Sequence, residues 1–272
     1  MKIPIFQIDA FTKTLFRGNP AAVCPLEHWL PDSVMQSVAA ENNLAETAFF
    51  VGRGGHYEIR WFTPEAEVDL CGHATLASAF VLFEAFGIQE EELVFISRSG
   101  PLKVRRHEGR LQLDFPAWEV GDYPLFGDLI DALGEEPVKL LTGGARDYIA
   151  VFRTEAEVRA LSPDMDSLQA LDRPGLVITA AGTDCDFVSR FFTPANGIPE
   201  DPVTGSSHCG LVPYWAKTLG RESLHARQVS KRGGELWCRL AGDRVLIAGH
   251  AVQVLQGLMV VTSEGGTPLT TA

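Results

Sequence analysis

The chain has 272 residues, 46% of them hydrophobic and 21% charged, and its formal net charge is −12 at pH 7. This length favours two domains, and this composition is ordinary for a soluble globular protein. A strongly negative protein lacks the positive surface that displaces counterions from nucleic acid, so we expect no nucleic-acid partner. A small anionic substrate is compatible with this charge, because local hydrogen-bond donors can outweigh the overall field.

The five cysteines are scattered and form no C-x-x-C pair, which favours reduced thiols in the cytoplasm over a disulfide framework. They are Cys24, Cys71, Cys185, Cys209 and Cys238. The N-terminal segment, MKIPIFQIDAF, has the pattern of a first strand rather than of a signal peptide. The sequence contains no run of about 18 apolar residues, so we expect no membrane-spanning segment.

In the first half of the chain, residues 3–10 are expected to form a strand, and residues 31–43 a helix that opens on Pro31 and Asp32. Residues 72–87, GHATLASAFVLFEAFG, read as a helix that is apolar on nearly every face and is therefore buried. Further expected strands are residues 45–52, residues 55–63 and a meander over residues 93–116.

The second half begins with residues 117–128, which are rich in Pro, Gly and acidic residues and are the expected linker. Strands are expected at 147–152 and 175–182, with an acidic helix over 154–163 between them. The chain should close with further strands, from residue 227 to residue 262.

An internal repeat is the most informative pattern. RWFTPEAEVDLCGHATLASAF (60–80) is similar to RFFTPANGIPEDPVTGSSHCGL (190–211), which carries three additional residues. The matched positions are Arg60 with Arg190, the Phe-Thr-Pro runs at 62–64 and 192–194, Glu67 with Glu200, and Gly72 with Gly205. Each copy is a strand, a loop, a glycine and a mostly apolar helix. We therefore expect two pseudo-symmetric domains that face each other across a cleft.

The glycine in each copy is expected to mark a helix start that binds an anion. A helix N-terminus presents amides without intrahelical partners and the positive end of the dipole, and glycine lets a ligand approach the backbone. Two such starts could hold a carboxylate, or the enolate that forms when a proton leaves carbon. Cys71 and His73 flank the first glycine, and Asp201, Thr204 and Ser206 surround the second.

Glu46, in NNLAETAFF, is a third candidate because it follows a helix and enters an apolar strand. Burial there would raise the pKa of a carboxyl toward the range that a general acid or base needs. The local sequence by itself fits an exposed acid at a strand edge better. For His73, a helix-capping role competes evenly with a catalytic one until the repeat is considered.

The motifs DAFT, FRGNPAAV, AETAFF, FTPEAEVDLCGHAT and EDPVTGS resemble those of the phenazine-biosynthesis PhzF-like family. The resemblance runs from Ile8 to about Val261. The wider fold group includes diaminopimelate epimerase and the two-cysteine proline racemases. The resemblance implies an α+β fold of two pseudo-symmetric domains, each a β-barrel-like roll around a central buried helix. Residues 1–117 would form the first domain, completed by residues 258–272, and residues 118–257 the second.

The resemblance also implies a cofactor-free, metal-free isomerase, usually homodimeric, that shifts a proton within a small carboxylate such as trans-2,3-dihydro-3-hydroxyanthranilate. The family's catalytic residues fall on Glu46, His73 and Asp201. The expected substrate-binding positions are Asn19, Cys71, Gly72, Thr204, Gly205 and Ser206. Epimerases of this fold use one cysteine on each face of the substrate, whereas this chain has Cys71 in one copy and Thr204 in the other. A hydroxyl has no usable acidity near neutral pH, so a two-thiol racemase is disfavoured.

Four other readings compete. A Ser-His hydrolase is disfavoured because GSSHCG is no G-x-S-x-G elbow, and adjacent residues on a helix point in different directions. A metal site built from Cys71, His73, His208 and Cys209 lacks a usual zinc spacing. An epimerase that uses Cys71 and an inactive protein that binds small anions both remain open.

Overall fold

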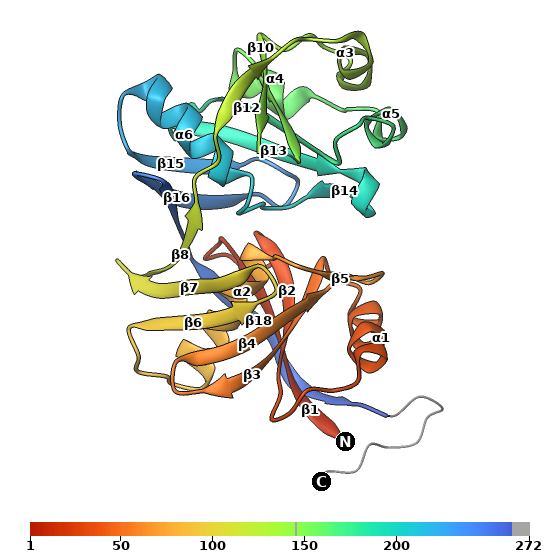
Figure 1. Ribbon diagram of the computed structural model, residues 1–272, viewed down its shortest axis with the longest axis vertical. Helices are drawn as coiled ribbons and strands as arrows, with labels where there is room; N and C mark the ends of the chain where they lie inside the picture. Colours follow the sequence, from red (N-terminus) through yellow and green to blue (C-terminus); the bar gives the residue numbers. More distant parts are fainter. Residues whose placement is uncertain (145, 263–272) are drawn as a thin grey trace. The chain divides into compact units, whose positions relative to one another are not determined.

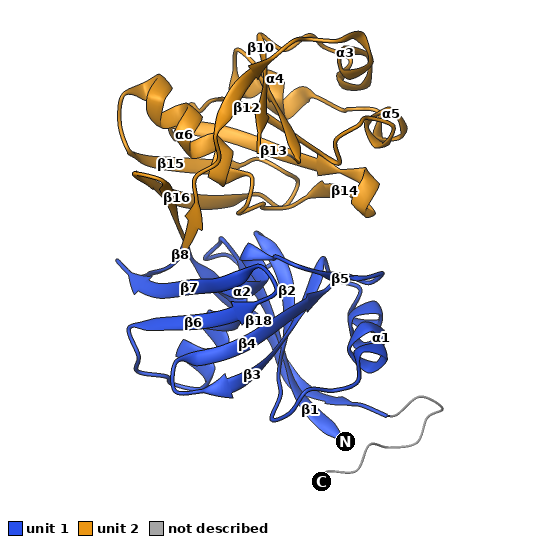
Figure 2. Ribbon diagram, in the orientation of Figure 1, with its two compact units in different colours: residues 1–113, 249–272 blue, residues 114–248 orange. Residues whose placement is uncertain are grey.

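The computed structural model describes residues 1–144 and 146–262, and the chain divides into two compact units. Unit 1 combines Met1–Leu113 with the chain from Gly249 onward, and unit 2 is Asp114–Ala248 (Figure 2). Both units mix antiparallel and parallel strands with a few helices, which confirms the α+β class (Figure 1).

Unit 1 is built from a long antiparallel pair and a meander around helix α2. β1 pairs with both β2 and β18, β2 runs parallel to β3, and β3 continues antiparallel into β4. Its elements are β1 (Lys2–Ala10), β2 (Asn19–Pro25), α1 (Asp32–Asn42), β3 (Glu46–Arg53), β4 (His56–Phe62), β5 (Glu67–Val68), α2 (Gly72–Phe80), the π-helix η1 (Val81–Ala85), β6 (Glu92–Ser97), β7 (Gly100–His107), most of β8 (Arg110–Pro116) and β18 (Ala251–Val260).

Helix α2 forms the centre of unit 1. It contacts β1, β2, β3, β7 and β18, and every residue from His73 to Ala79 is buried. A helix surrounded by strands must be apolar on all sides, which is what the sequence of this segment predicts. The expected helix over 72–87 is therefore confirmed in place, although its last turns widen into the π-helix before Gly87.

Unit 2 repeats the plan around α6. Here β11 runs parallel to β12, β12 pairs antiparallel with β13, and β13 pairs with β14 and β15. Its elements are β9 (Val120–Tyr123), α3 (Gly127–Leu133), β10 (Lys139–Gly143), β11 (Asp147–Val151), α4 (Glu155–Ala160), α5 (Met165–Gln169), β12 (Gly175–Ala181), β13 (Phe187–Thr193), the 3-10 helix η2 (Pro194–Asn196), β14 (Ile198–Asp201), α6 (His208–Leu219), β15 (Ser223–Gln228), β16 (Gly234–Ala241) and β17 (Arg244–Gly249).

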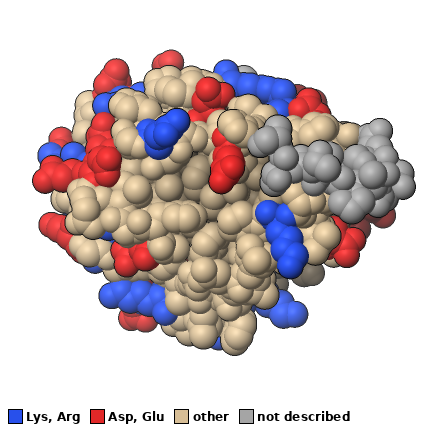
Figure 3. All heavy atoms as spheres, turned by 90° about the horizontal axis from the view of Figure 1, so that it is seen from below, with Lys and Arg blue, Asp and Glu red and all other residues tan. Residues whose placement is uncertain are grey.

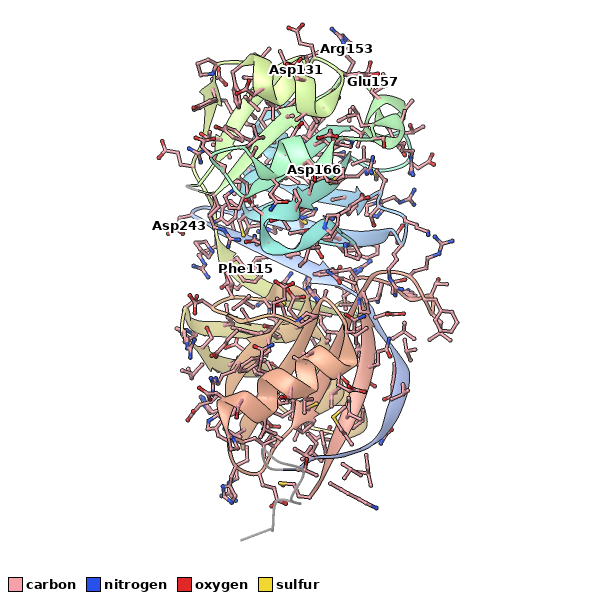
Figure 4. The ribbon with its side chains drawn as sticks, turned by 90° about the vertical axis from the view of Figure 1, so that its right-hand side faces the viewer. Phe115, Asp131, Arg153, Glu157, Asp166 and Asp243 are labelled. Carbon is pink, nitrogen blue, oxygen red and sulfur yellow. The ribbon has the colours of Figure 1, made fainter. Side chains whose placement is uncertain are left out.

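The short helix α4 shows how local sequence fixes its start. The Thr154 hydroxyl accepts the Glu157 backbone N–H at 3.2 Å, and the Glu157 carboxylate accepts the backbone N–H groups of Arg153 and Thr154. Arg153 and Glu157 are labelled beside this helix in Figure 4. This capping box satisfies amides that the first helical turn leaves without intrahelical partners. It explains why the acidic segment forms the helix expected there.

The expected linker over residues 117–128 is wrong. β9 lies inside it and pairs with β10, and α3 begins at Gly127. The units instead divide at Leu113 and Asp114, inside the continuous strand β8, where composition gives no signal.

The chain also returns to unit 1 at Gly249, because β18 pairs with β1 along nearly its whole length. The expected second boundary was residue 257. Residues 263–272 of the expected 258–272 segment lie outside the described part of the chain.

The same arginine–glutamate ion pair occurs in both copies of the repeat. Arg60 donates to both carboxylate oxygens of Glu67 at 2.7 and 2.8 Å, and Arg190 does the same to Glu200 at 2.7 and 3.0 Å. Each guanidinium also lies over a phenylalanine of its own strand, Phe62 or Phe192, at 5.2 and 4.8 Å from the ring centroid. A forked arginine–carboxylate pair fixes two chain segments in one geometry, here a strand and the hairpin that precedes the glycine.

The second copy differs at the helix start. α2 begins at Gly72 as expected, but α6 begins at His208, three residues after Gly205. The backbone N–H of His208 bonds to the carbonyl of Gly205 at 3.1 Å, and that of Cys209 to the carbonyl of Ser206 at 3.0 Å. These tighter bonds make residues 205–207 a turn that leads into α6, so the expectation of a helix that starts at Gly205 is wrong.

Acidic and basic side chains are interspersed with neutral ones on the face drawn in Figure 3. Among the described residues, no helix is long and apolar enough to cross a bilayer.

Candidate active site

The first cluster of predicted site residues lies where two parallel strands meet the start of α2 in unit 1. Asn19 is the first residue of β2 and Glu46 the first of β3, and these strands are paired so that Ala21 faces Glu46. Cys71 is the N-cap of α2 and His73 its second residue. The parallel pairing and the helix start thus bring together side chains that are far apart in the sequence.

His73 is the centre of this cluster. Its Nε2 lies 3.2 Å from Glu46 Oε2, and its Nδ1 lies 3.2 Å from Asn19 Nδ2 and 3.5 Å from Cys71 Sγ. The approach to Glu46 falls outside hydrogen-bond alignment although the distance is short. Only 6% of the His73 side chain and 13% of the Glu46 side chain is exposed, so the alternative of an exposed acid at residue 46 is wrong.

Burial holds His73 neutral. Removing the imidazolium from water lowers the pKa of His73 from 6.5 to about 3. The Asn19 side-chain amide and the Cys71 thiol lie against Nδ1, and Nε2 is the nitrogen that faces Glu46. A small rotation would align Nε2 with the Glu46 carboxyl group for a hydrogen bond.

The same side chains are also the candidate metal ligands of the described chain. Ligand atoms of Glu46, Cys71 and His73 all lie within 4.8 Å of one another. The short contacts, however, involve opposite ring nitrogens: the thiol approaches Nδ1 and the carboxylate approaches Nε2. One metal ion binds one imidazole nitrogen, so this arrangement fits a hydrogen-bonded acid–base cluster better than a zinc centre.

The second cluster lies in unit 2, in the loop that joins β14 to α6. Asp201 ends β14, and the Thr204 hydroxyl donates to Asp201 Oδ2. The Gln228 side chain bonds to both residues, with its Oε1 accepting from Thr204 N at 2.8 Å and its Nε2 donating to Asp201 O at 2.7 Å. Asp201 is 9% exposed and Thr204 7%.

The turn after this loop carries Gly205 and Ser206, and the helix behind it is internal. His208 is fully buried and its Nδ1 donates to the Thr204 carbonyl at 2.8 Å, while Cys209 is 2% exposed. Burial lowers the pKa of His208 to about 4 and raises that of Cys209 to about 12. Neither residue joins the metal-ligand cluster, in line with their reading as packing residues.

Sequence reasoning missed Gln228. The repeat, if extended past the helices, aligns Ser97-Arg98-Ser99 with Gln228-Val229-Ser230, and this alignment would have drawn attention to the position where the copies differ.

Comparisons with known proteins show the family and the fold. A sequence model of the family described as phenazine biosynthesis-like protein matches residues 8–257. An uncharacterized isomerase of Pseudomonas aeruginosa is 53% identical over 94% of this chain and 98% of its own length. The crystal structure of a PhzF-family phenazine biosynthesis protein from Enterococcus faecalis has a TM-score of 0.92 at 48% identity, covering 95% of this chain and 99% of that one.

The fold extends to more distant enzymes. A hydroxyproline epimerase from Agrobacterium vitis has a TM-score of 0.61 at 11% identity, over 99% of this chain and 96% of its own. The expected fold class is confirmed by this likeness, and the expected family by the closer relatives. With a family model over nearly the whole length and close relatives named as isomerases, the chain belongs to the phenazine biosynthesis-like, or PhzF-like, isomerase family.

Proposed function

We propose that this isomerase shifts a proton within a small unsaturated carboxylate, with Glu46 as both general base and general acid. The observation that carries the proposal is the approach of the Glu46 carboxylate to neutral, buried His73, at 3.2 Å. An enclosed carboxylate beside a neutral imidazole can accept a proton from one carbon and deliver a proton to another.

The Glu46 carboxylate would remove a proton from a saturated carbon of the substrate. The electrons of that C–H bond move into the adjacent double-bond system and spread toward the substrate carboxylate. Glu46, now protonated, delivers a proton to a second carbon of this system, either the one that it removed or one that the carboxyl has exchanged with solvent. No electrons leave the substrate, so the step balances without another reactant.

The negative charge that develops on the substrate needs hydrogen-bond donors. The backbone N–H groups of Gly72 and His73 are the first two of α2, and a first helical turn leaves its amides without intrahelical partners. We assign the same role to the amides of Gly205 and Ser206 in the turn before α6. Removing one preorganised donor of this kind typically costs about 3–4 kcal/mol of transition-state stabilisation.

The remaining site residues would orient the reacting groups. Asn19 fixes the His73 ring through Nδ1, and His73 supports Glu46 through Nε2. Asp201, with Thr204 bonded to it, would hold the polar groups of the substrate or relay their protons. A substrate like trans-2,3-dihydro-3-hydroxyanthranilate offers the carboxylate, amine and hydroxyl that such groups recognise. The homodimer and the cytoplasmic location implied by the resemblance stay predictions.

The second candidate is an epimerase based on Cys71. The contact of its thiol with His73 Nδ1 at 3.5 Å favours it, because a histidine can take a thiol proton. The second copy opposes it, since the Thr204 hydroxyl donates to Asp201 where a second thiol would be needed.

Deuterium incorporation tests the proposal. The protein is incubated in D₂O with trans-2,3-dihydro-3-hydroxyanthranilate and with a panel of amino and unsaturated acids, and the products are analysed by NMR and mass spectrometry. Isomerisation with deuterium at the newly protonated carbon supports the proton shift. Exchange at the α-carbon of an amino acid would favour the epimerase, and binding without exchange would favour an inactive binding protein.

A further inference from the structure

The side chain of Gln228 clamps the loop that carries Asp201. Gln228 is the last residue of β15, is 1% exposed, and comes from a strand that runs parallel to β13. Its Oε1 accepts the Thr204 backbone N–H at 2.8 Å, and its Nε2 donates to the Asp201 carbonyl at 2.7 Å and to Thr204 Oγ1 at 3.3 Å.

These partners fix which way the amide points. A backbone N–H can only donate and a backbone carbonyl can only accept, so the oxygen of Gln228 must face Thr204 N and its nitrogen must face Asp201 O. The flip ambiguity of a glutamine side chain is therefore removed here by the backbone.

The oriented amide in turn orients the Thr204 hydroxyl. Because Gln228 Nε2 donates to Thr204 Oγ1, the hydroxyl hydrogen points away from Gln228 and toward Asp201 Oδ2, to which it donates. Two hydrogen bonds thus run in one direction, from the Gln228 amide to the Thr204 hydroxyl and from that hydroxyl to the Asp201 carboxylate. A hydroxyl that donates to a carboxylate both stabilises its charge and fixes the plane of the group.

The first copy of the repeat shows that the fold does not require this series of hydrogen bonds. Phe187 pairs with Ala226 in unit 2 and Tyr57 with Phe95 in unit 1, and this register places Ser97 at the position of Gln228. The Ser97 hydroxyl donates to Gly100 O at 2.8 Å, within its own turn.

The residue at the position of Asp201 differs between the two copies of the repeat, as does the residue at the position of Gln228. Asp201 faces Phe191 in unit 2, and the equivalent residue that faces Trp61 in unit 1 is Val68. The second copy therefore has both the aspartate and the glutamine, and the first copy has neither.

A neighbouring contact behaves differently and supplies the control. Ser230 Oγ donates to Pro202 O at 2.7 Å, and the equivalent Ser99 Oγ donates to Asp69 O at 2.9 Å. This serine–carbonyl bond occurs in both copies, so it belongs to the shared architecture of the loop. The Gln228 clamp is confined to the copy with Asp201.

We infer that Gln228 is a positioning residue for the isomerisation: it orients the Thr204 hydroxyl so that Asp201 is held in its working geometry. This inference rests on the proposed role of Asp201.

The test compares Gln228→Glu with Ser230→Ala in the full-length protein. Glutamate has nearly the shape of glutamine, and its ionised side chain can still accept from Thr204 N but cannot donate to Asp201 O or Thr204 Oγ1. We expect Gln228→Glu to lower kcat at least tenfold, and Ser230→Ala to leave kcat within twofold of wild type.

A spectroscopic readout separates the inference from the activity assay. A buried hydroxyl hydrogen held on a carboxylate exchanges slowly with water, and Thr204→Val identifies its proton NMR signal by removing it. We expect this signal in wild type and in Ser230→Ala, and its loss in Gln228→Glu. An unchanged signal in Gln228→Glu, no such signal in wild type, or an equal loss of kcat in both variants would overturn the inference. A lost signal with no effect on kcat would instead contradict the assigned role of Asp201.

Discussion

Glu46 Oε2 lies 3.2 Å from Nε2 of His73, the ring nitrogen opposite the one that contacts Asn19. Glutamine at residue 46 would keep the shape of the side chain and remove its basicity. We therefore predict that Glu46→Gln lowers turnover about 10³-fold, within the range of a lost general acid–base group, with substrate affinity nearly unchanged. Deuterium exchange and equilibrium binding measure the two effects, and exposed Glu41→Gln on α1 is the control. Near-normal turnover in Glu46→Gln would move the base to another carboxyl, with Asp201 next.

Cys71→Ser distinguishes a carboxyl mechanism from a thiol mechanism. The thiol is the N-cap of α2 and touches His73, but a proton shift by Glu46 does not pass through it. We predict that turnover falls less than tenfold, in the same deuterium assay. An inactive Cys71→Ser variant that still folds and binds substrate would restore the epimerase reading.

Buried histidines should make the protein less stable in acid. Burial lowers the pKa of His208 from 6.5 to about 4, so below pH 6.5 the unfolded chain binds a proton that the folded protein refuses. The stability contributed by neutral His208 is complete above pH 6.5 and is lost as the pH falls toward 4.

His208→Asn is the variant that isolates this effect, because asparagine can keep the donation to the Thr204 carbonyl. Urea unfolding should show the stability difference between wild type and variant shrinking by about 1 kcal/mol from about pH 7.5 to about pH 5.5. A difference that does not depend on pH would mean that His208 titrates over the same pH range in the folded protein and in the unfolded chain.

Asp147 is a buried acidic residue, and burial raises its pKa, whereas it lowers the pKa of His208. The rung that pairs Ala21 with Glu46 in unit 1 corresponds to the rung that pairs Asp147 with Gly175 in unit 2. A Cβ on Gly175 would lie 2.1 Å from Asp147 Oδ1, so in unit 2 the carboxyl comes from the neighbouring strand. Asp147 is 3% exposed, and desolvation raises its pKa to about 6 against the opposing effects of Arg146 and Arg173.

Asp147→Asn should therefore stabilise the protein at neutral pH. Raising a carboxyl pKa from 3.8 to about 6 destabilises the charged folded form by up to about 3 kcal/mol. The destabilisation is absent below pH 4, grows as the pH rises to 6, and is complete above it. Denaturant unfolding at about pH 8 and about pH 4 measures the gain, which should vanish at the lower pH. Gly175→Ala, which must displace the carboxyl, should destabilise at both.

The sequence by itself determined the repeat and the buried helix, and it supplied the candidate site residues other than Gln228. Arg60 was matched with Arg190 and Glu67 with Glu200 from the repeat alone, and in each copy the arginine and the glutamate form the same forked contact. The apolar run after Gly72 predicted a helix surrounded by strands, because burial on all sides leaves an unmistakable composition. Motif resemblance, rather than local pattern, brought Glu46 into the site.

Only the tertiary structure decided the contacts within the two clusters of candidate site residues. Asn19, Glu46 and His73 meet because β2 and β3 pair in parallel beside the start of α2, and pairing register is a long-range property. The delayed start of α6 depends on tighter backbone bonds after Gly205. The Gln228 clamp joins the end of a strand to a loop, and no periodic pattern in the sequence predicts such a contact. The unit boundary falls inside a continuous strand, since β8 is built like any other strand and only its partners differ.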